Sequence, residues 1–283
     1  MPAPASSTLL VGLAVESTLW GVYLHLLFWS FALCYRRAEH ERPPRPVFVM
    51  SGLLFVACTM HLMSGIDAVW AVTNVSVNAI SGSPGDILIP LCNAIGLLLL
   101  VNRCWKVWGK ETWVVLPAGA AALLGFVLTT NFAFNPSDPD GLLSTILSII
   151  GHSFLLYSNL STIPLIAAGL DRRSYFLSLD NPQEKKTLVS TASVLVECGL
   201  LHLLAQAVLF LFVVLEHPFK YAVGAGAVQI FGLSSALGLV RTGLGHTMPD
   251  VDVELETREL TAEEEEEAKA VERAVLRAFD CDV

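Results

Sequence analysis

The sequence is poor in charged residues. Only 15% of its 283 residues are Asp, Glu, Lys or Arg, whereas soluble domains carry about 25%. The mean hydropathy is +0.61, and apolar stretches of about twenty residues or more recur along the whole chain. The composition therefore argues against an ordinary soluble domain and predicts an all-α, polytopic membrane protein.

Several motifs that would identify a chemistry are also missing. There is no G-x-S-x-G elbow, Walker loop or dinucleotide fingerprint. The last apolar stretch, 221–244, has no lysine for a retinal Schiff base. No stretch has a histidine pair at H-x-x-x-H spacing or a clustered basic face. We therefore expect a non-enzyme with no catalytic residue, metal site, cofactor or nucleic-acid partner.

The cysteines do not form a disulfide framework. The chain has six, and none lies in a predicted outer loop. We expect them to be buried or interfacial thiols.

Seven apolar stretches have the length of membrane-spanning helices, since about 20 residues at 1.5 Å each cross about 30 Å of hydrocarbon. We expect one membrane domain, 9–245, between a short extracellular N-terminus, 1–8, and a tail, 246–283. The stretch 87–108 is the expected central helix. The predicted spans are approximately 9–35, 47–72, 87–108, 113–132, 142–170, 188–215 and 221–244.

Basic residues alternate between the connections. Those after the first, third and fifth spans carry four, about three and four Lys or Arg residues, and the others carry none, none and one. Because Lys and Arg favour the cytoplasmic side, this predicts an outer N-terminus and a cytosolic C-terminus. Asn74 then belongs to an outer glycosylation sequon, whereas the Asn159 sequon should be silent inside its span. We expect the plasma membrane or another secretory-pathway membrane.

The tail carries the whole net charge of −9. Asp250 to Val283 contains thirteen acidic and four basic residues. Thr261 and the glutamates after it are typical of a helix start, so we expect a partly helical or disordered acidic tail. Together with the 171–187 connection, it is the predicted contact surface for a cytosolic signalling partner.

Polar side chains inside the apolar spans mark the predicted ligand pocket, because such residues are costly in lipid. Counting along the helices places Glu197 near the midplane and most of the others in the outer half. His202 and Gln206 share a helix face, which Glu197 and His202 do not. Packing through interhelical hydrogen bonds is the alternative reading. The predicted pocket residues are Glu16, His61, Asp67, Asn93, Glu197, His202, Gln206 and Gln229.

Basic and tryptophan residues mark the opposite, cytoplasmic face. Arg103 stands where G-protein-coupled receptors keep an arginine, but the acid and tyrosine that flank theirs are missing. Their N-P-x-x-Y motif is missing too, so we interpret Arg103 first as an anchor and second as a switch. The predicted cytoplasmic-face residues are Arg103, Trp105, Trp108, Arg172, Arg173 and Arg241.

Four segments together resemble a known family. They are ESTLWGVYLHLLFWSFALCYRR, NRCWKVWGKETWVVLP, VLVECGLLHLL and FGLSSALGLVRTGLG. Over about 15–245 the chain resembles the uncharacterised seven-helix integral membrane proteins of mushroom-forming fungi. The resemblance implies receptor-like topology and no particular chemistry.

These observations predict a receptor-like protein that senses a small ligand in the outer half of its bundle. One alternative is a small-solute or proton-linked transporter, which would show a polar path and broken helices at the midplane. Another is a membrane-embedded enzyme, which would bring His61, His152 and His202 to one point.

Overall fold

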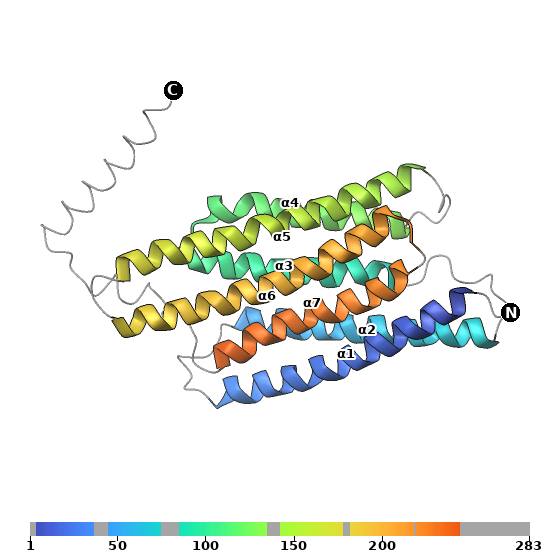
Figure 1. Cartoon of the computed structure of the whole chain (residues 1–283), viewed down its shortest axis with the longest axis horizontal. Helices are drawn as coiled ribbons and strands as arrows, with labels where there is room; N and C mark the ends of the chain where they lie inside the picture. Colours follow the sequence, from blue (N-terminus) through green and yellow to red (C-terminus); the bar gives the residue numbers. More distant parts are fainter. Residues whose placement is uncertain are drawn as a thin grey trace, which may run out of the picture. The chain divides into compact units, whose positions relative to one another are not determined.

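The described chain is entirely helical in its regular structure (Figure 1). The computed structural model describes residues 4–36, 45–74, 85–134, 142–177, 182–217 and 219–243. Each helix contains a stretch long and apolar enough to cross a membrane, as in a multi-pass membrane protein. The seven helices are α1 (Pro4–Tyr35), α2 (Arg45–Asn74), α3 (Gly85–Val107), α4 (Thr112–Phe134), α5 (Leu142–Leu177), α6 (Pro182–Val214) and α7 (Lys220–Gly243).

The chain divides into two compact units, Met1–Thr247 and Met248–Val283, and all seven helices belong to the first. The predicted acidic tail lies outside the described residues. The side chains of Asn74, Arg172 and Arg173 lie outside them as well.

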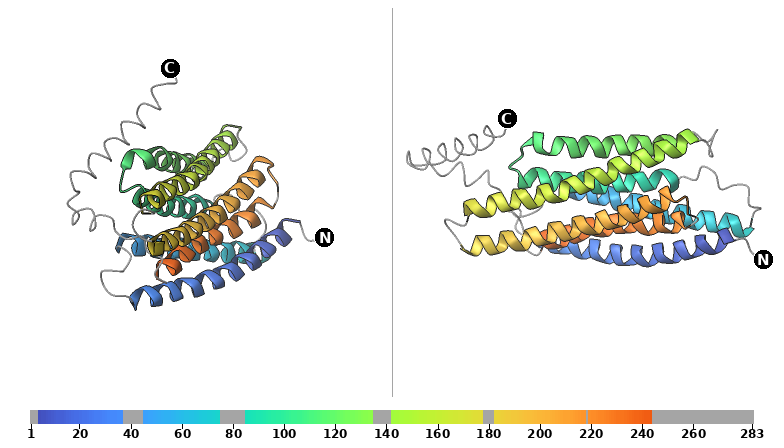
Figure 2. Two further views of the ribbon diagram at one scale, coloured as in Figure 1. Left: turned by 60° about the vertical axis from the view of Figure 1, so that its left-hand side comes forward. Right: turned by 45° about the horizontal axis from the view of Figure 1, so that its top comes forward.

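Consecutive helices pack against one another, and α1 closes the ring against α7, its most extensive contact. Two helices also make contacts across the ring: α3 touches α5 and α7, and α7 touches α2. The views in Figures 1 and 2 place α4 and α5 on one side of the bundle and α1 on the opposite side. Within the membrane-length stretch of α7, 78% of residues are buried, against 50% for α3 and 17% for α1. The expected central helix, α3, therefore shares that position with α7, which is more enclosed.

The outward faces of the helices are apolar. Phe28 of α1 is 68% exposed and Leu204 of α6 is 63% exposed. Water would make such a surface unstable, whereas lipid chains solvate it. Both the inside and the outside of the bundle are thus built from apolar side chains.

Small residues let two helices approach backbone to backbone. A Cβ atom on Gly125 of α4 would lie 2.8 Å from the Gly151 carbonyl oxygen of α5. A Cβ atom on Gly151 would lie 2.9 Å from the backbone nitrogen of Thr129. Close packing of this kind is how helices associate in lipid, where burial of apolar surface supplies little drive.

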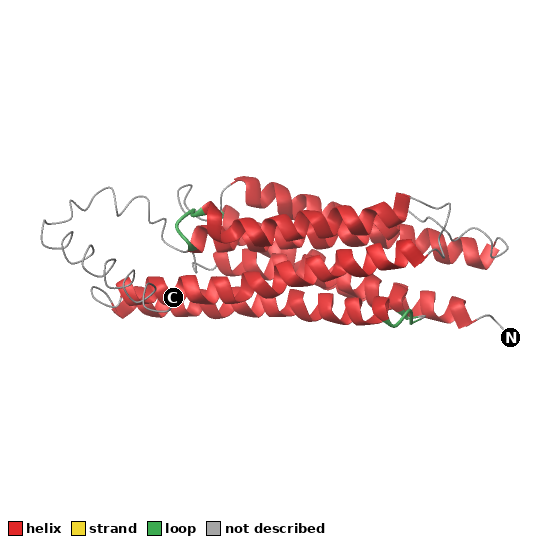
Figure 3. Cartoon of the chain, turned by 90° about the horizontal axis from the view of Figure 1, so that it is seen from above, coloured by secondary structure: helices red, strands yellow, loops and turns green. Residues whose placement is uncertain are grey.

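A Schellman cap ends α3 and starts the turn into α4 (the turn at one end of the bundle in Figure 3). The Gly109 N–H donates to the Lys106 carbonyl at 3.2 Å, and the Lys110 N–H donates to the Trp105 carbonyl at 2.9 Å. Gly109 has φ 64° and Lys110 has φ 69°. Glycine supplies the left-handed conformation that this cap requires.

Helices α5 and α6 extend furthest beyond their predicted spans. Helix α5 runs to Leu177 rather than to residue 170, and α6 begins at Pro182 rather than near residue 188. The length of an apolar stretch shows how much of a helix crosses the membrane, but it does not show where the helix ends, because the ends depend on capping residues. Proline is favoured at the first position of a helix, as at Pro182. Most of the expected 171–187 connection is therefore helical.

Candidate functional site

The structure sorts the predicted pocket residues into a buried set and an exposed pair. The exposed pair is Asp67 and Glu197. The buried set forms two hydrogen-bonded clusters, one between α1, α2 and α7, and one between α3, α5, α6 and α7. Its members are Glu16, His61, Asn93, His202, Gln206 and Gln229.

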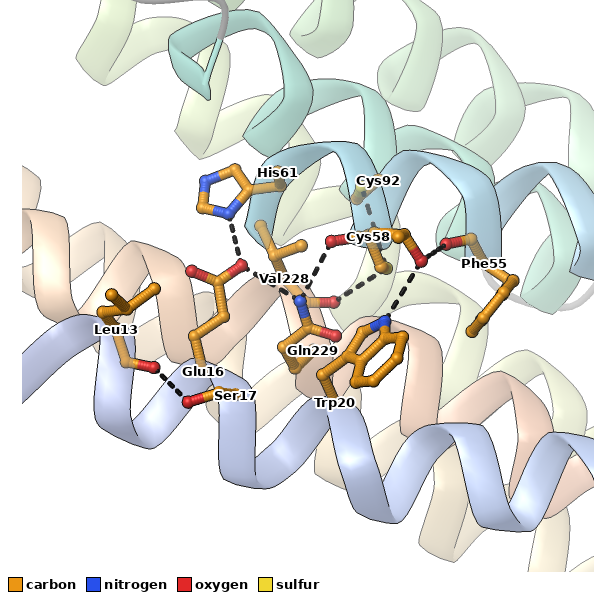
Figure 4. Close-up of polar contacts among 11 residues, drawn as sticks. Leu13, Glu16, Ser17, Trp20, Phe55, Cys58, His61, Cys92, Val228 and Gln229 are labelled. Atoms are coloured by element: carbon orange, nitrogen blue, oxygen red, sulfur yellow. Dashed lines mark hydrogen bonds and ion pairs between the residues drawn. The ribbon is translucent and has the colours of Figure 1, made fainter. Parts of the chain in front are cut away.

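The first group, here named the carboxylate cluster, consists of Glu16, His61 and Gln229 (Figure 4). His61 Nδ1 lies 2.6 Å from Glu16 Oε1. The Gln229 Nε2 group donates to the same oxygen at 3.0 Å. Each residue comes from a different helix and is at most 8% exposed. One carboxylate oxygen thus joins three helices inside the bundle.

Gln229 leaves one buried acceptor unused. Its Nε2 group also donates to the Cys58 carbonyl at 3.2 Å. Because both neighbours are acceptors, the amide must present its NH₂ group to them. Gln229 Oε1 then points elsewhere, is buried, and has no hydrogen-bond partner among the described residues. A buried carbonyl oxygen without a donor is costly, so this atom is a ready acceptor for a ligand.

Thiols and aromatic rings surround the carboxylate cluster. Cys58 Sγ lies 3.9 Å from Cys92 Sγ and 3.5 Å from the Val228 carbonyl oxygen. The Trp20 indole N–H donates to the Thr59 hydroxyl of α2 at 3.1 Å. These contacts hold α1, α2 and α7 in one register.

The second group, here named the amide–histidine cluster, centres on Asn93 of α3. Asn93 Nδ2 donates to Gln206 Oε1 at 2.5 Å, and His202 Nε2 lies 3.0 Å from Asn93 Oδ1. Gln206 Nε2 lies 3.5 Å from His152 Nδ1, and the Ser234 hydroxyl lies 3.5 Å from His202 Nδ1. All five side chains are buried.

The hydrogen-bond contacts of Asn93 and Gln206 determine which atom donates and which accepts in each of them. Asn93 uses its NH₂ group on Gln206, so its Oδ1 must accept from a protonated His202 Nε2. Gln206 accepts through Oε1 and donates through Nε2 to His152 Nδ1, which is then an acceptor. The result is a polar chain from His202 of α6 through Asn93 and Gln206 to His152 of α5. The Ser234 hydroxyl of α7 lies at its end and donates to the Phe231 carbonyl at 2.9 Å.

The sequence singled out some members and missed others. The four-residue spacing of His202 and Gln206 does place both against Asn93. His152 enters the sequence prediction only through the alternative of a membrane-embedded enzyme and not as a pocket residue. Ser234 was missed because a serine in an apolar helix gives no signal. For the exposed residues Asp67 and Glu197, a count along the helix gives depth but not the direction in which a side chain points.

The predicted cytoplasmic-face residues have separate roles. The Arg103 guanidinium donates to the Ser235 carbonyl at 3.3 Å and so links α3 to α7. The Trp108 indole donates to the Leu165 carbonyl at 2.8 Å and links α3 to α5. The Trp105 indole donates to the Lys110 carbonyl at 2.7 Å, within the α3–α4 turn. Arg241 is exposed.

The described histidines do not gather around one point. His61 belongs to the carboxylate cluster, and His152 and His202 belong to the other. In the part of the chain that the structure describes, no three His, Cys, Asp or Glu residues are placed to hold one metal ion. The five described cysteines are buried.

Comparison of the chain with protein-family models, with curated proteins and with solved structures gives no match.

Proposed function

We propose that the chain is a receptor-like seven-helix protein that senses a small ligand in the outer half of its bundle. In this proposal the N-terminus is outside, the C-terminus is cytosolic, and the chain lies in the plasma membrane or another secretory-pathway membrane. Membership of the fungal seven-helix family that it resembles belongs to the same proposal.

One observation supports the ligand site above all. The carboxylate cluster is a buried junction of a carboxyl group, an imidazole and an amide, and Gln229 Oε1 has no hydrogen-bond partner among the described residues. Residues of this kind inside a membrane bundle are costly and commonly serve binding or switching. Beside Glu16, α2 carries Gly65, where even an added Cβ would lie 3.5 Å from Glu16 Oε2. A small ligand with an N–H or O–H donor could bond to both Gln229 Oε1 and Glu16 Oε2.

Binding at this junction would bias the bundle between two arrangements. Because Glu16, His61 and Gln229 come from three helices, a ligand that takes over one of their bonds favours a different spacing of α1, α2 and α7. A ligand shifts such an equilibrium only through its different affinity for the two arrangements. Helix α7 also carries the Ser235 carbonyl that receives Arg103, so its movement reaches the predicted cytoplasmic face.

The continuous helices favour a receptor over a transporter. Each described helix runs through its membrane-length stretch without interruption, even where Pro90, Pro117 and Pro164 lie inside. Transporters of the broken-helix type place their sites at interruptions near the midplane. The separation of His61 from His152 and His202 likewise gives no support to the enzyme alternative.

A thermal-shift screen with matched variants tests the ligand site. The purified full-length protein is screened against small amines, alcohols and amides, and each stabilising compound is retested on Glu16→Gln, Gln229→Leu and Glu197→Gln. We expect the rise in Tm to be lost in the first two variants and kept in Glu197→Gln, because that carboxylate is exposed and outside the cluster. Stabilisation that is equal in all variants would contradict the proposed site.

Proximity labelling from the C-terminal tail tests the receptor class. A tail-deleted chain is the control. Specific recovery of G-protein subunits or another signalling partner supports the proposal, and recovery of the same proteins with both chains argues against it.

A further inference from the structure

A small cavity lies between α3, α6 and α7, apart from the carboxylate cluster. Its volume is about 10 Å³, which is room for one water-sized body. Its lining combines the Arg103 guanidinium with Cys198, His202 and the two serines Ser234 and Ser235.

The guanidinium in this cavity has more donors than partners. Arg103 carries five N–H groups, and it bonds to the Ser235 carbonyl and contacts the side chain of Cys198. Among the described residues, no carboxylate lies within ion-pair distance of its nitrogens. The other charges that act on Cys198 are Glu197 and Arg241, which are exposed and of opposite sign. Within the part of the chain that the structure describes, the positive charge of Arg103 is therefore left without an ion-pair partner.

The backbone of α7 keeps this space open for the guanidinium. A Cβ atom on Gly238 would overlap the Arg103 guanidinium, so glycine at this position lets the charge lie against α7. One turn earlier, the Ser234 and Ser235 hydroxyls bond to the Phe231 carbonyl of their own helix, at 2.9 and 3.2 Å. The proton of a serine hydroxyl can rotate from one acceptor to another.

We propose that this cavity binds one small monovalent anion, such as chloride, against the Arg103 guanidinium. The guanidinium supplies the charge and at least one N–H donor, and a serine hydroxyl can turn its proton from the Phe231 carbonyl to the anion. The small volume selects single-atom anions over carboxylates and phosphates. A bound anion would neutralise Arg103 and fasten α3 to α7.

Anion-dependent stability of the full-length protein tests this site. Unfolding in detergent is followed in sodium chloride, sodium bromide and sodium gluconate at one ionic strength. We expect chloride and bromide to raise Tm by roughly 5 °C over gluconate at saturation, because an ion that binds only the folded state stabilises it. The chloride effect should vanish in Arg103→Gln and persist in Arg241→Gln, which removes an exposed arginine.

Two further variants and a crystallographic measurement test the same site if Arg103→Gln folds poorly. Cys198→Leu fills the cavity, keeps the charge, and should abolish the chloride effect. Arg103→Lys keeps the charge without the planar donors and should weaken it. Crystals grown in bromide should show an anomalous peak within ion-pair distance of the Arg103 nitrogens. A Tm that does not depend on the anion, a chloride effect retained in Arg103→Gln, or no bromide peak at Arg103 would each overturn the proposal.

Discussion

Glu16 is the residue on which most of the buried polar contacts of α1 depend. Its Oε1 atom contacts His61 at 2.6 Å and receives the Gln229 amide at 3.0 Å. One proton lies between Oε1 and His61 Nδ1, whichever of the two atoms holds it. Removing Glu16 takes this contact from the buried His61 ring and leaves the Gln229 amide with only the Cys58 carbonyl. The loss of such buried contacts costs more than the pair contributes by its presence.

A double-mutant cycle on Glu16→Gln and His61→Phe measures this dependence. We expect a coupling free energy of about 1 kcal/mol or more, at the upper end of values for hydrogen bonds between membrane helices. The measurement is the free energy of unfolding in mixed detergent. A control cycle of Glu16→Gln with Thr129→Ala of α4 should give a coupling near zero. Equal coupling in the two cycles would refute the direct bond.

The two tryptophans at either side of the α3–α4 turn make a second test at this scale. Trp108 donates to the Leu165 carbonyl, whereas Trp113 is 82% exposed. Trp108→Phe removes the indole donor and should lower stability by about 1 kcal/mol. Trp113→Phe should change it by less than about 0.5 kcal/mol. Thermal unfolding of both variants distinguishes a structural bond from an interfacial preference.

At the scale of the elements, the α3–α4 turn depends on its glycine. Gly109→Ala forces an alanine to φ 64° and should cost about 1 kcal/mol. Gly52→Ala is the matched control, because Gly52 lies inside α2 and a Cβ there meets nothing within 4 Å. That control should be neutral or slightly stabilising, since alanine is the better helix former. An unchanged Tm in Gly109→Ala would show that the cap is not strained by a side chain.

The existence of the helices could be predicted from sequence, but their rotation could not. Seven sequence stretches with few charges and sufficient length predict seven helices, and the structure contains seven helices long and apolar enough to cross a membrane. In water, an apolar stripe shows which face of a helix is buried. Here Leu204 faces outward and Leu209 faces inward, and both are apolar because lipid replaces water outside. Glu197 could therefore be assigned a depth but no direction, and it is exposed.

The polar clusters were only partly predictable for the same reason. An Asn, Gln or His is easily recognised within an apolar span of the sequence, as Asn93, Gln206 and Gln229 are. Their pairing depends on which helices are neighbours, and contacts such as Glu16 with Gln229 join residues 213 positions apart. No local pattern carries that information.

At the scale of the whole molecule, orientation is the prediction that most needs a measurement. With an outer N-terminus, an N-terminal epitope should bind antibody on intact cells, and a C-terminal epitope should do so only after permeabilisation. Asn74→Gln should abolish a glycosidase-sensitive mass shift. Asn159→Gln should leave that shift unchanged, because Asn159 is fully buried within α5. The reverse accessibility of the two epitopes would invert the proposed topology.

The enclosure of α7 has a consequence for how the protein is made. Synthesis at 5–20 residues per second separates Glu16 from Gln229 by roughly 10 to 40 s. By the end of that interval the six preceding helices have been synthesised, and the place that α7 will fill is still open. Glu16 then has His61 as its partner but lacks the amide that completes the cluster. A chain arrested before Lys220 would present this pair to lipid or to the translocation machinery, so we expect it to be retained and degraded. The last helix is thus the step at which biosynthetic quality control can tell a finished bundle from an unfinished one.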